Sequence, residues 1–157
     1  MPDMLVKLYD LPDNGALLEE LQGKGYRILR AMAPNKIKVL EFVRNNFGDL
    51  WASECDVAFS NHPISCIIAV NAEKEVVGFA CYETTCKAFF GPTGVLEKCR
   101  GLKIGKALLI SALQGLKEMG YAYAIIGGPN EAIGFYEKSV NATVISGSYP
   151  GIYRDMI

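Results

Sequence analysis

The sequence predicts an α+β domain with three hairpin-connected strands in its middle. Three observations lead to this fold class. The length of 157 residues fits one domain. The middle of the chain holds three apolar runs joined by short polar connections, and the last third alternates between strand-like and helix-like segments. Half of the residues are hydrophobic and 21% are charged, which is typical of a globular chain.

The first third of the chain is expected to be mostly helical. Residues 1–24 contain no clear strand, and a short helix is expected over 14–22. Residues 26–31 alternate between polar and apolar side chains, which predicts a strand. Two helices are expected next, over 34–48 and 49–59, because a proline opens the first, a glycine ends it and an aspartate caps the second.

The middle and last thirds carry the other elements. Strands are expected at residues 65–71, 76–83 and 88–95, a helix at 104–119, a strand at 123–126, a helix at 133–138, and strands at 143–145 and 153–157. Pro92 interrupts the third of these strands. Because proline removes a ladder hydrogen bond, a turn or a break is expected between Gly91 and Gly94.

Composition excludes several classes of protein. Lys plus Arg is 16 and Asp plus Glu is 17, so the net charge of −1 gives no reason to expect nucleic-acid binding. No apolar run approaches the about 18–20 residues that span a bilayer, and the N-terminus lacks a signal-peptide pattern. Five cysteines without a Cys-x-x-Cys pair favour reduced thiols in a cytoplasmic protein. With His62 as the single histidine, two-histidine zinc motifs are impossible, and no metal is expected.

Glycines gather in the second half, where 11 of the 16 lie from Gly91 onward. Gly101 and Gly105 stand at the predicted start of the 104–119 helix, where unpaired backbone amides and the helix dipole attract phosphate. Cations nearby are Arg100, Lys103 and Lys106. The alternative is an ordinary strand-to-helix turn with solvated lysines.

Two other phosphate-binding motifs do not fit this turn. A P-loop would need glycine where Arg100 stands and a hydroxyl side chain where Ala107 stands. A dinucleotide-binding Gly-x-Gly-x-x-Gly is absent, and the turn comes too late in the chain for a first βα unit. A magnesium-dependent kinase is therefore disfavoured.

The turn instead resembles the pyrophosphate loop of the GNAT superfamily of acetyl-CoA-dependent N-acetyltransferases. That loop is usually written Arg/Gln-x-x-Gly-x-Gly/Ala, and Arg100 and Gly105 match it. Lys103 stands where the family prefers glycine. Residues 132–138 resemble the family's Ala-Ile-x-Phe-Tyr-Glu-Lys helix, and residues 76–80 resemble its third strand.

The resemblance covers roughly residues 26–157 and implies an α/β/α sandwich with a mixed, mostly antiparallel sheet. We therefore expect one acetyltransferase domain over 1–157, with 1–24 as an N-terminal extension and 26–157 as the GNAT-like core. In the family the fourth strand carries a bulge and splays from the fifth, which admits the pantetheine arm. Gly91 and Pro92 are compatible with such a break.

The resemblance also implies acetyl-CoA as co-substrate, with no metal. The residues expected to bind it are Val95, Leu96, Arg100, Gly101, Leu102, Lys103, Ile104, Gly105, Lys106, Asn130 and Phe135. A backbone amide near Val95 or Leu96 is expected to stabilise the oxyanion. Tyr136 is expected near the thioester sulfur, where it would protonate the leaving thiolate; core packing is the alternative.

The general base and the acceptor site are less narrowly defined. Glu83 is expected to act as base, directly or through water, and a solvated strand-end carboxylate is the alternative. Glu54 and Asp56 are further candidates. Phe47, Trp51 and Glu54 are expected to line the acceptor site, although aromatic side chains of this kind commonly pack in the core.

The function expected is an acyltransferase that moves an acetyl group to a primary amine of a small molecule, amino sugars included. Two alternatives stay open: a non-catalytic acyl-CoA sensor with the same fold, and an enzyme that acetylates protein or peptide amines. No membrane or nucleic-acid partner is expected, and a homodimer is the default.

Overall fold

The computed structural model describes all residues from 1 to 157. Seven strands form one sheet in the order β2-β3-β4-β5-β6-β1-β7. Their bounds are β1 Met4–Lys7, β2 Arg27–Arg30, β3 Cys66–Val70, β4 Val76–Tyr82, β5 Phe89–Val95, β6 Tyr123–Ile126 and β7 Thr143–Val144. Every neighbouring pair is antiparallel except β5 and β6. The mixed, mostly antiparallel sheet is thus confirmed.

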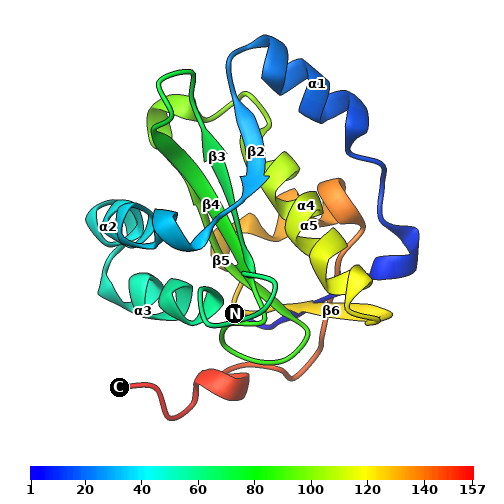
Figure 1. The fold of residues 1–157 in the computed structure, drawn as a ribbon. Helices are drawn as coiled ribbons and strands as arrows, with labels where there is room; N and C mark the ends of the chain where they lie inside the picture. The colour runs from blue at the N-terminus through cyan, green and yellow to red at the C-terminus, as the bar shows by residue number, and fades with distance from the viewer.

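Five α-helices cover the two faces of this sheet (Figure 1). They are α1 Gly15–Gly23, α2 Lys36–Phe47, α3 Asp49–Ala58, α4 Ile104–Glu118 and α5 Ile133–Val140. The α2 and α3 helices lie on one face, and α1, α4 and α5 lie on the other. Two buried apolar clusters, one on each face, hold the layers together. The expected α/β/α sandwich is confirmed.

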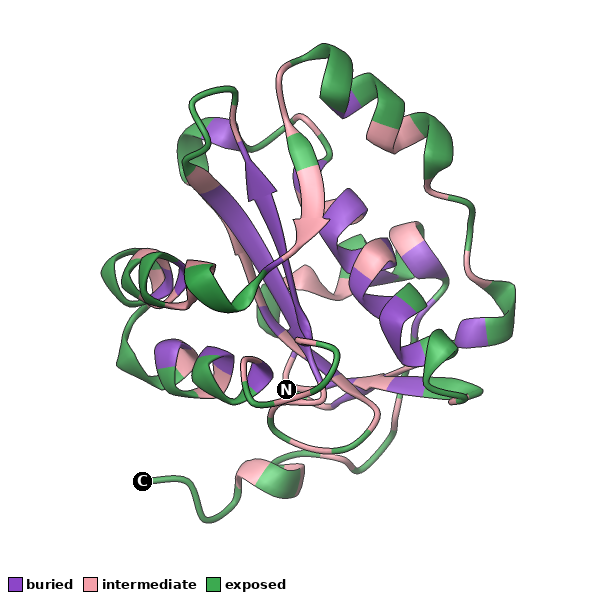
Figure 2. Cartoon of the chain, viewed as in Figure 1, coloured by how far each residue is buried: buried purple, intermediate pink, exposed green.

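The deepest part of the molecule is the centre of the sheet and the helix against it. Figure 2 shows β3, β4 and the inner side of α4 as buried. The α4 helix contributes nine buried residues, Leu108 and Leu113 among them, because its apolar stripe faces the sheet along the whole length. No helix in the chain is both long and apolar enough to cross a bilayer.

The bulge expected near Pro92 is present in β5. Ala80 of β4 faces Thr93, but Tyr82 faces Phe90, so β5 holds one more residue than β4 over this stretch. Just before the bulge, β5 pairs with β6 at two positions, Phe89–Ile125 and Phe90–Ile126, and beyond them the pairing ends. The two strands therefore splay apart toward their carboxyl ends, as predicted.

The expectation of no strand in residues 1–24 is wrong. Residues 4–7 form β1, which inserts between β6 and β7 and pairs with both. Met4 and Val6 are fully buried, whereas Lys7 is exposed. Four residues are too few for a clear alternation pattern, and the pairing partners lie more than 110 residues further along the chain.

The strand expected over 153–157 is also wrong. Gly151–Tyr153 is a short 3-10 helix, and residues 154–157 follow it without a sheet partner. The Tyr153 hydroxyl lies against Gly127, and the Phe89 ring is the other close neighbour of that glycine. This segment is therefore fixed by packing rather than by strand pairing. The other expected helices and strands are present, with ends shifted by a few residues.

Candidate active site

The start of α4 presents a row of free backbone amides. The amides of residues 101–106 donate to no acceptor within the chain, and no side chain caps the helix. The first bond of this helix is from the Ala107 amide to the Lys103 carbonyl. Six consecutive unpaired N–H groups at a helix N-terminus form a concave donor surface that suits the oxygens of a pyrophosphate.

The positive charges around this loop are also unpaired. Arg100 and Lys103 are exposed and Lys106 is half-buried, and none of them forms an ion pair within the chain. They add to the partial positive charge of the helix dipole. The loop is therefore ready for an anionic ligand without any internal contact having to break.

Lys103 holds a backbone conformation that usually belongs to glycine. Its φ is 68° and its ψ is 22°, in the left-handed region, and Gly101 two residues earlier has a φ of 86°. The position where the family prefers glycine is thus one where the backbone needs a positive φ. A side chain there is disfavoured by roughly 1–2 kcal/mol because Cβ approaches the carbonyl oxygen.

Replacing Lys103 with glycine is expected to raise the free energy of unfolding by up to about 1 kcal/mol, since the relief of strain exceeds the added entropy of the unfolded chain. Urea denaturation measures it. Lys106→Gly is the matched control, because it removes the same charge but introduces glycine into the first turn of a helix and should destabilise. Equal destabilisation by both variants would contradict the account.

The end of β5 offers one of the two amides expected to bind the oxyanion. The Leu96 amide donates to the Val77 carbonyl at 2.9 Å, so it is already used by the sheet. Val95 is paired with Gly78 at the next position, where antiparallel geometry turns the amide away from β4. Its amide makes no bond within the chain and faces the splayed side of β5. Of the two candidates, Val95 is the one with a free donor.

Several predicted cofactor residues come together beside this loop. A Cβ placed on Gly105 would lie 3.8 Å from both Phe135 and Val95, so the loop, α5 and β5 meet at that glycine. Phe135 is 38% exposed. Asn130 is exposed and lies at the start of a 3-10 helix ahead of α5, with a φ of 51°.

Tyr136 lies deeper in the same region. Its ring packs edge-on against Phe90 and Phe135, with centroid distances of 6.2 Å and 5.2 Å. The Tyr136 hydroxyl has no hydrogen-bond partner in the chain. Asn14 Oδ1 is the only side-chain nitrogen or oxygen atom that is both buried and without a partner, so the Tyr136 hydroxyl is not fully buried. The hydroxyl therefore still reaches solvent. Burial raises the pKa of Tyr136 to about 12, so the phenol stays protonated and can donate.

The raised pKa of Tyr136 predicts a pH dependence of stability. The pKa of Tyr136 is about 12 in the folded chain, above the ordinary value of 10. The protonated phenol therefore stabilises the folded state fully below pH 10, and this stabilisation is lost as the pH rises toward 12. A rise of two pKa units corresponds to about 2–3 kcal/mol in the free energy of unfolding. Urea denaturation between pH 9 and about pH 12 should show this loss in the parent chain, and a smaller loss in Tyr136→Phe. Identical pH profiles would contradict the assignment.

Glu83 is held in place by two donors. One carboxylate oxygen accepts a hydrogen bond from the Tyr121 hydroxyl and the other accepts one from the Ala88 amide, both at 2.7 Å. Its own amide donates to the carbonyl of Phe89, next to the ring that packs on Tyr136. Glu83 and Tyr136 thus border the same end of β5.

The residues expected at the acceptor site lie on the other side of β5. Phe47 and Trp51 stack with a centroid distance of 5.5 Å, and both pack against Phe79. Gly94 allows this approach, because a Cβ there would come within 2.5 Å of the Phe47 ring. Both aromatic side chains are half-buried, so they combine core packing with an accessible edge.

The two acidic candidates on α3 differ in their surroundings. Glu54 is half-buried and accepts a 2.5 Å hydrogen bond from the Thr85 hydroxyl. Asp56 is exposed and forms a 2.8 Å ion pair with Lys36. Glu54 is therefore the one placed beside the strand ends.

Tyr153 was not expected in this region. Burial is the main cause that raises its pKa to about 12, and Glu54, Asp3 and Cys86 raise it further, so these groups are neighbours. Its hydroxyl lies so close to Gly127 that a Cβ there would be 2.7 Å away. The C-terminal segment thus closes the region between α3 and β6, a long-range contact that no local pattern predicts.

The chain matches the model of the Acetyltransferase (GNAT) family over residues 35–141, and it belongs to this family. A search of curated proteins found no match. The family resemblance and the fold inferred from it are thereby confirmed. The family supports an acyltransferase that uses an acyl-CoA.

Solved structures share the fold at low sequence identity. A GCN5-related glucosamine N-acetyltransferase region in a fungal multi-domain β-N-acetylglucosaminidase is 16% identical, with a TM-score of 0.73, over 92% of this chain and 19% of that one. A GCN5-related N-acetyltransferase from Sphaerobacter thermophilus is 17% identical, with a TM-score of 0.66, over 92% and 48%. A Drosophila protein is 12% identical, with a TM-score of 0.66, over 92% and 47%. The chain spans about half or less of these structures.

Proposed function

We propose that this chain transfers an acetyl group from acetyl-CoA to the primary amine of a small molecule, as one acetyltransferase domain over residues 1–157. The observation that carries the proposal is the row of free amides at residues 101–106. The pyrophosphate accepts hydrogen bonds from these amides, and the phosphates lie among three unpaired cations: Arg100, Lys103 and Lys106. The pantetheine arm runs along β5 into the gap where β5 and β6 separate.

The acetyl group then lies beside the free amide of Val95. As the amine attacks the thioester carbon, the carbonyl oxygen gains negative charge and accepts a hydrogen bond from this amide. The tetrahedral intermediate collapses by breaking the carbon–sulfur bond. The nitrogen releases its surplus proton through water, and this restores the proton that Tyr136 gives to the thiolate. The Tyr136 hydroxyl donates to the departing thiolate, a role suited to a phenol that burial keeps protonated.

The attacking amine must first lose a proton. An amine with an ordinary pKa of about 10.4 is neutral in only about one molecule in 2,500 at pH 7, a penalty of roughly 4–5 kcal/mol. We assign proton removal to Glu83, acting through a chain of water molecules. Both of its oxygens already accept hydrogen bonds, and it lies at the Phe89 end of β5, away from Val95. Glu54 holds the ammonium form of the substrate before this step.

We favour an amino sugar as the acceptor. The stacked faces of Phe47 and Trp51 suit the apolar face of a sugar ring, and Glu54 supplies a carboxylate for its amine. The fungal structure that shares this fold contains a glucosamine N-acetyltransferase region. That likeness supports this choice without deciding the substrate.

A screen of amines with acetyl-CoA tests the proposal. The panel contains amino sugars, aminoglycosides, polyamines, amino acids and a peptide, and mass spectrometry of the acetylated product is the readout. We expect acetylation of an amino sugar. If only the peptide is acetylated, the acceptor is a protein or peptide amine and the proposed small-molecule acceptor is wrong.

A non-catalytic acyl-CoA sensor is the second candidate. The observation that favours it is Glu83, since a carboxylate bonded through both oxygens is a poorer base than a free one. Acetyl-CoA binding without turnover of any amine in the panel would support the sensor. Failure to bind acetyl-CoA would exclude both functions.

A further inference from the structure

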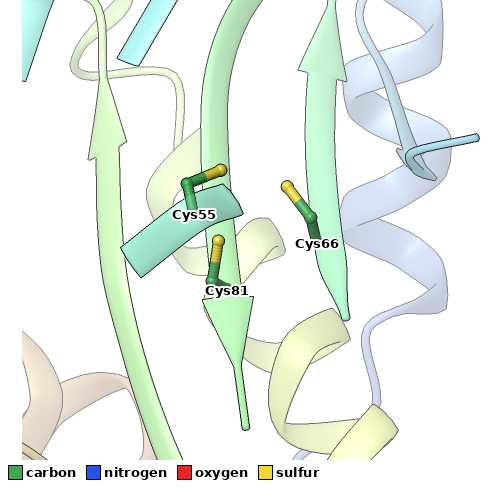
Figure 3. A group of neighbouring side chains, drawn as sticks. All are labelled: Cys55, Cys66 and Cys81. Atoms are coloured by element: carbon green, nitrogen blue, oxygen red, sulfur yellow. The ribbon is translucent and has the colours of Figure 1, made fainter. Parts of the chain in front are cut away.

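Three of the five cysteines meet in the interior, on the face of the sheet covered by α2 and α3. Cys55 comes from α3, Cys66 from the start of β3 and Cys81 from β4, and their side chains point toward a common space (Figure 3). All three are fully buried. Their sulfur atoms all lie within 4.8 Å of one another.

The sheet register explains why two of these thiols are neighbours. Cys66 and Cys81 are directly opposite each other in β3 and β4. The next pair along the two strands is Ser65 and Tyr82, and the Tyr82 amide donates to the Ser65 carbonyl. Because hydrogen-bonded and non-hydrogen-bonded pairs alternate, the two cysteines occupy a non-hydrogen-bonded position. Side chains at such positions share a face and approach most closely, with Cα atoms about 4.5 Å apart.

The third thiol is brought in by the inner side of α3. Cys55 lies between Ala52 and Ala58 on the buried side of this helix. These two small side chains let the helix approach the sheet closely, so the sulfur of Cys55 reaches the cysteine pair. Three separate elements therefore converge on one point with no other metal-ligating side chain in the cluster.

We propose that Cys55, Cys66 and Cys81 form a three-sulfur site for one soft, monovalent metal ion, Cu(I). Thiolates select soft ions such as Cu(I) and zinc. Structural zinc takes four ligands, and catalytic zinc takes three and an accessible water. This site has three sulfurs and is closed to solvent, which matches an ion that is satisfied by three sulfur ligands.

The spacing of the sulfurs fits such an ion with little movement. With metal–sulfur bonds of about 2.3 Å, three sulfurs around a central ion lie about 4.0 Å apart. In the structure the three sulfurs already lie within 4.8 Å of one another. A contraction of less than about 1 Å, mostly by side-chain rotation, completes the site.

Binding exchanges protons for the metal ion and transfers no electrons. Each thiol that ligates the ion releases its proton to solvent as the sulfur–copper bond forms, and copper stays Cu(I) throughout.

The site would fasten α3 to the sheet. Trp51 and Glu54 lie on the same helix, about one turn or less from Cys55. An ion bound at this point would therefore hold these two residues of the proposed acceptor site in place. The ion site itself does not depend on the proposed reaction. It is tested by binding alone.

The experiment is a titration of the fully reduced protein with Cu(I) under anaerobic conditions, using a coloured Cu(I) chelator as competitor. We expect one Cu(I) per chain, three sulfur ligands by X-ray absorption, and a higher Tm with the ion bound. Cys55→Ala should retain its fold, because alanine suits a helix, but should bind at least 10-fold more weakly with two sulfur ligands.

Cys99→Ala is the matched control, because Cys99 is also buried but belongs to the other face of the sheet. It should bind Cu(I) as the parent chain does, with three sulfurs. The proposal is overturned if the reduced parent chain binds no Cu(I), if Cys55→Ala keeps three sulfur ligands, or if Zn(II) displaces Cu(I) from the site.

Discussion

Tyr136→Phe is expected to lower kcat for acetyl transfer about 100-fold, while the KM for acetyl-CoA changes little. The substitution removes one hydroxyl and keeps the ring that packs on Phe90 and Phe135. In the proposed function the loop at 101–106 supplies most of the contacts to acetyl-CoA, so binding should be preserved. The step that suffers is the departure of the thiolate, which no longer receives a hydrogen bond. Steady-state kinetics with the amine found by the screen measures the effect.

Tyr149→Phe is the control for this variant. Tyr149 is 70% exposed and lies in the C-terminal segment, so losing its hydroxyl should leave both kinetic constants unchanged. Thermal melting checks that both variants are folded. If Tyr136→Phe keeps the parent kcat, the tyrosine serves only packing, and the proton for the thiolate comes from solvent.

Val6→Asp is expected to lower the free energy of unfolding by more than about 3 kcal/mol, or to prevent folding. Val6 is fully buried in β1 and faces Ala124 of β6. A carboxylate there has no cation beside it and loses its hydration. For a domain of this size the Tm should fall by about 10 °C. Urea denaturation and thermal melting measure the change.

Lys7→Asp is the matched control on the same strand. Lys7 is exposed, so the same aspartate at the next position should change stability by less than about 0.5 kcal/mol. The comparison tests whether β1 belongs to the sheet. Equal and small effects at both positions would mean that the N-terminal residues are an appendage, as the sequence suggested.

Most of the fold was predictable because its elements are marked locally. The α4 helix has a continuous apolar stripe and ends near Gly120, and β3 is an unbroken apolar run. The break in β5 was predictable because proline cannot donate to a ladder, and Gly91–Pro92 is where the bulge lies. The loop that we propose to bind acyl-CoA was expected from the sequence, since glycines, cations and a helix start occur together there.

The missed features depend on contacts between distant parts of the chain. The β1 strand is defined by β6 and β7 rather than by its own four residues. Tyr153 reaches the proposed acceptor side only because the C-terminal segment folds back over Gly127. The three-cysteine cluster joins residues that show no motif spacing, because one comes from a helix and two from neighbouring strands.

The site was predicted unevenly for the same reason. The free amides of residues 101–106 follow from a local turn, and the sequence located them correctly. The choice of Val95 over Leu96 as oxyanion donor depends on which amide the sheet uses, which only the register shows. The left-handed conformation of Lys103 was also hidden, although the departure from glycine marked the position.

The measurement that tests the central claim most directly is a titration of the ¹⁵N-labelled protein with coenzyme A, followed by the backbone amide signals in NMR. Free coenzyme A carries the pyrophosphate and the pantetheine arm but cannot be turned over. We predict the largest shifts at the amides of residues 101–106, with a second group along β5 that includes Val95. Binding that shifts other amides and leaves 101–106 unchanged would contradict the account.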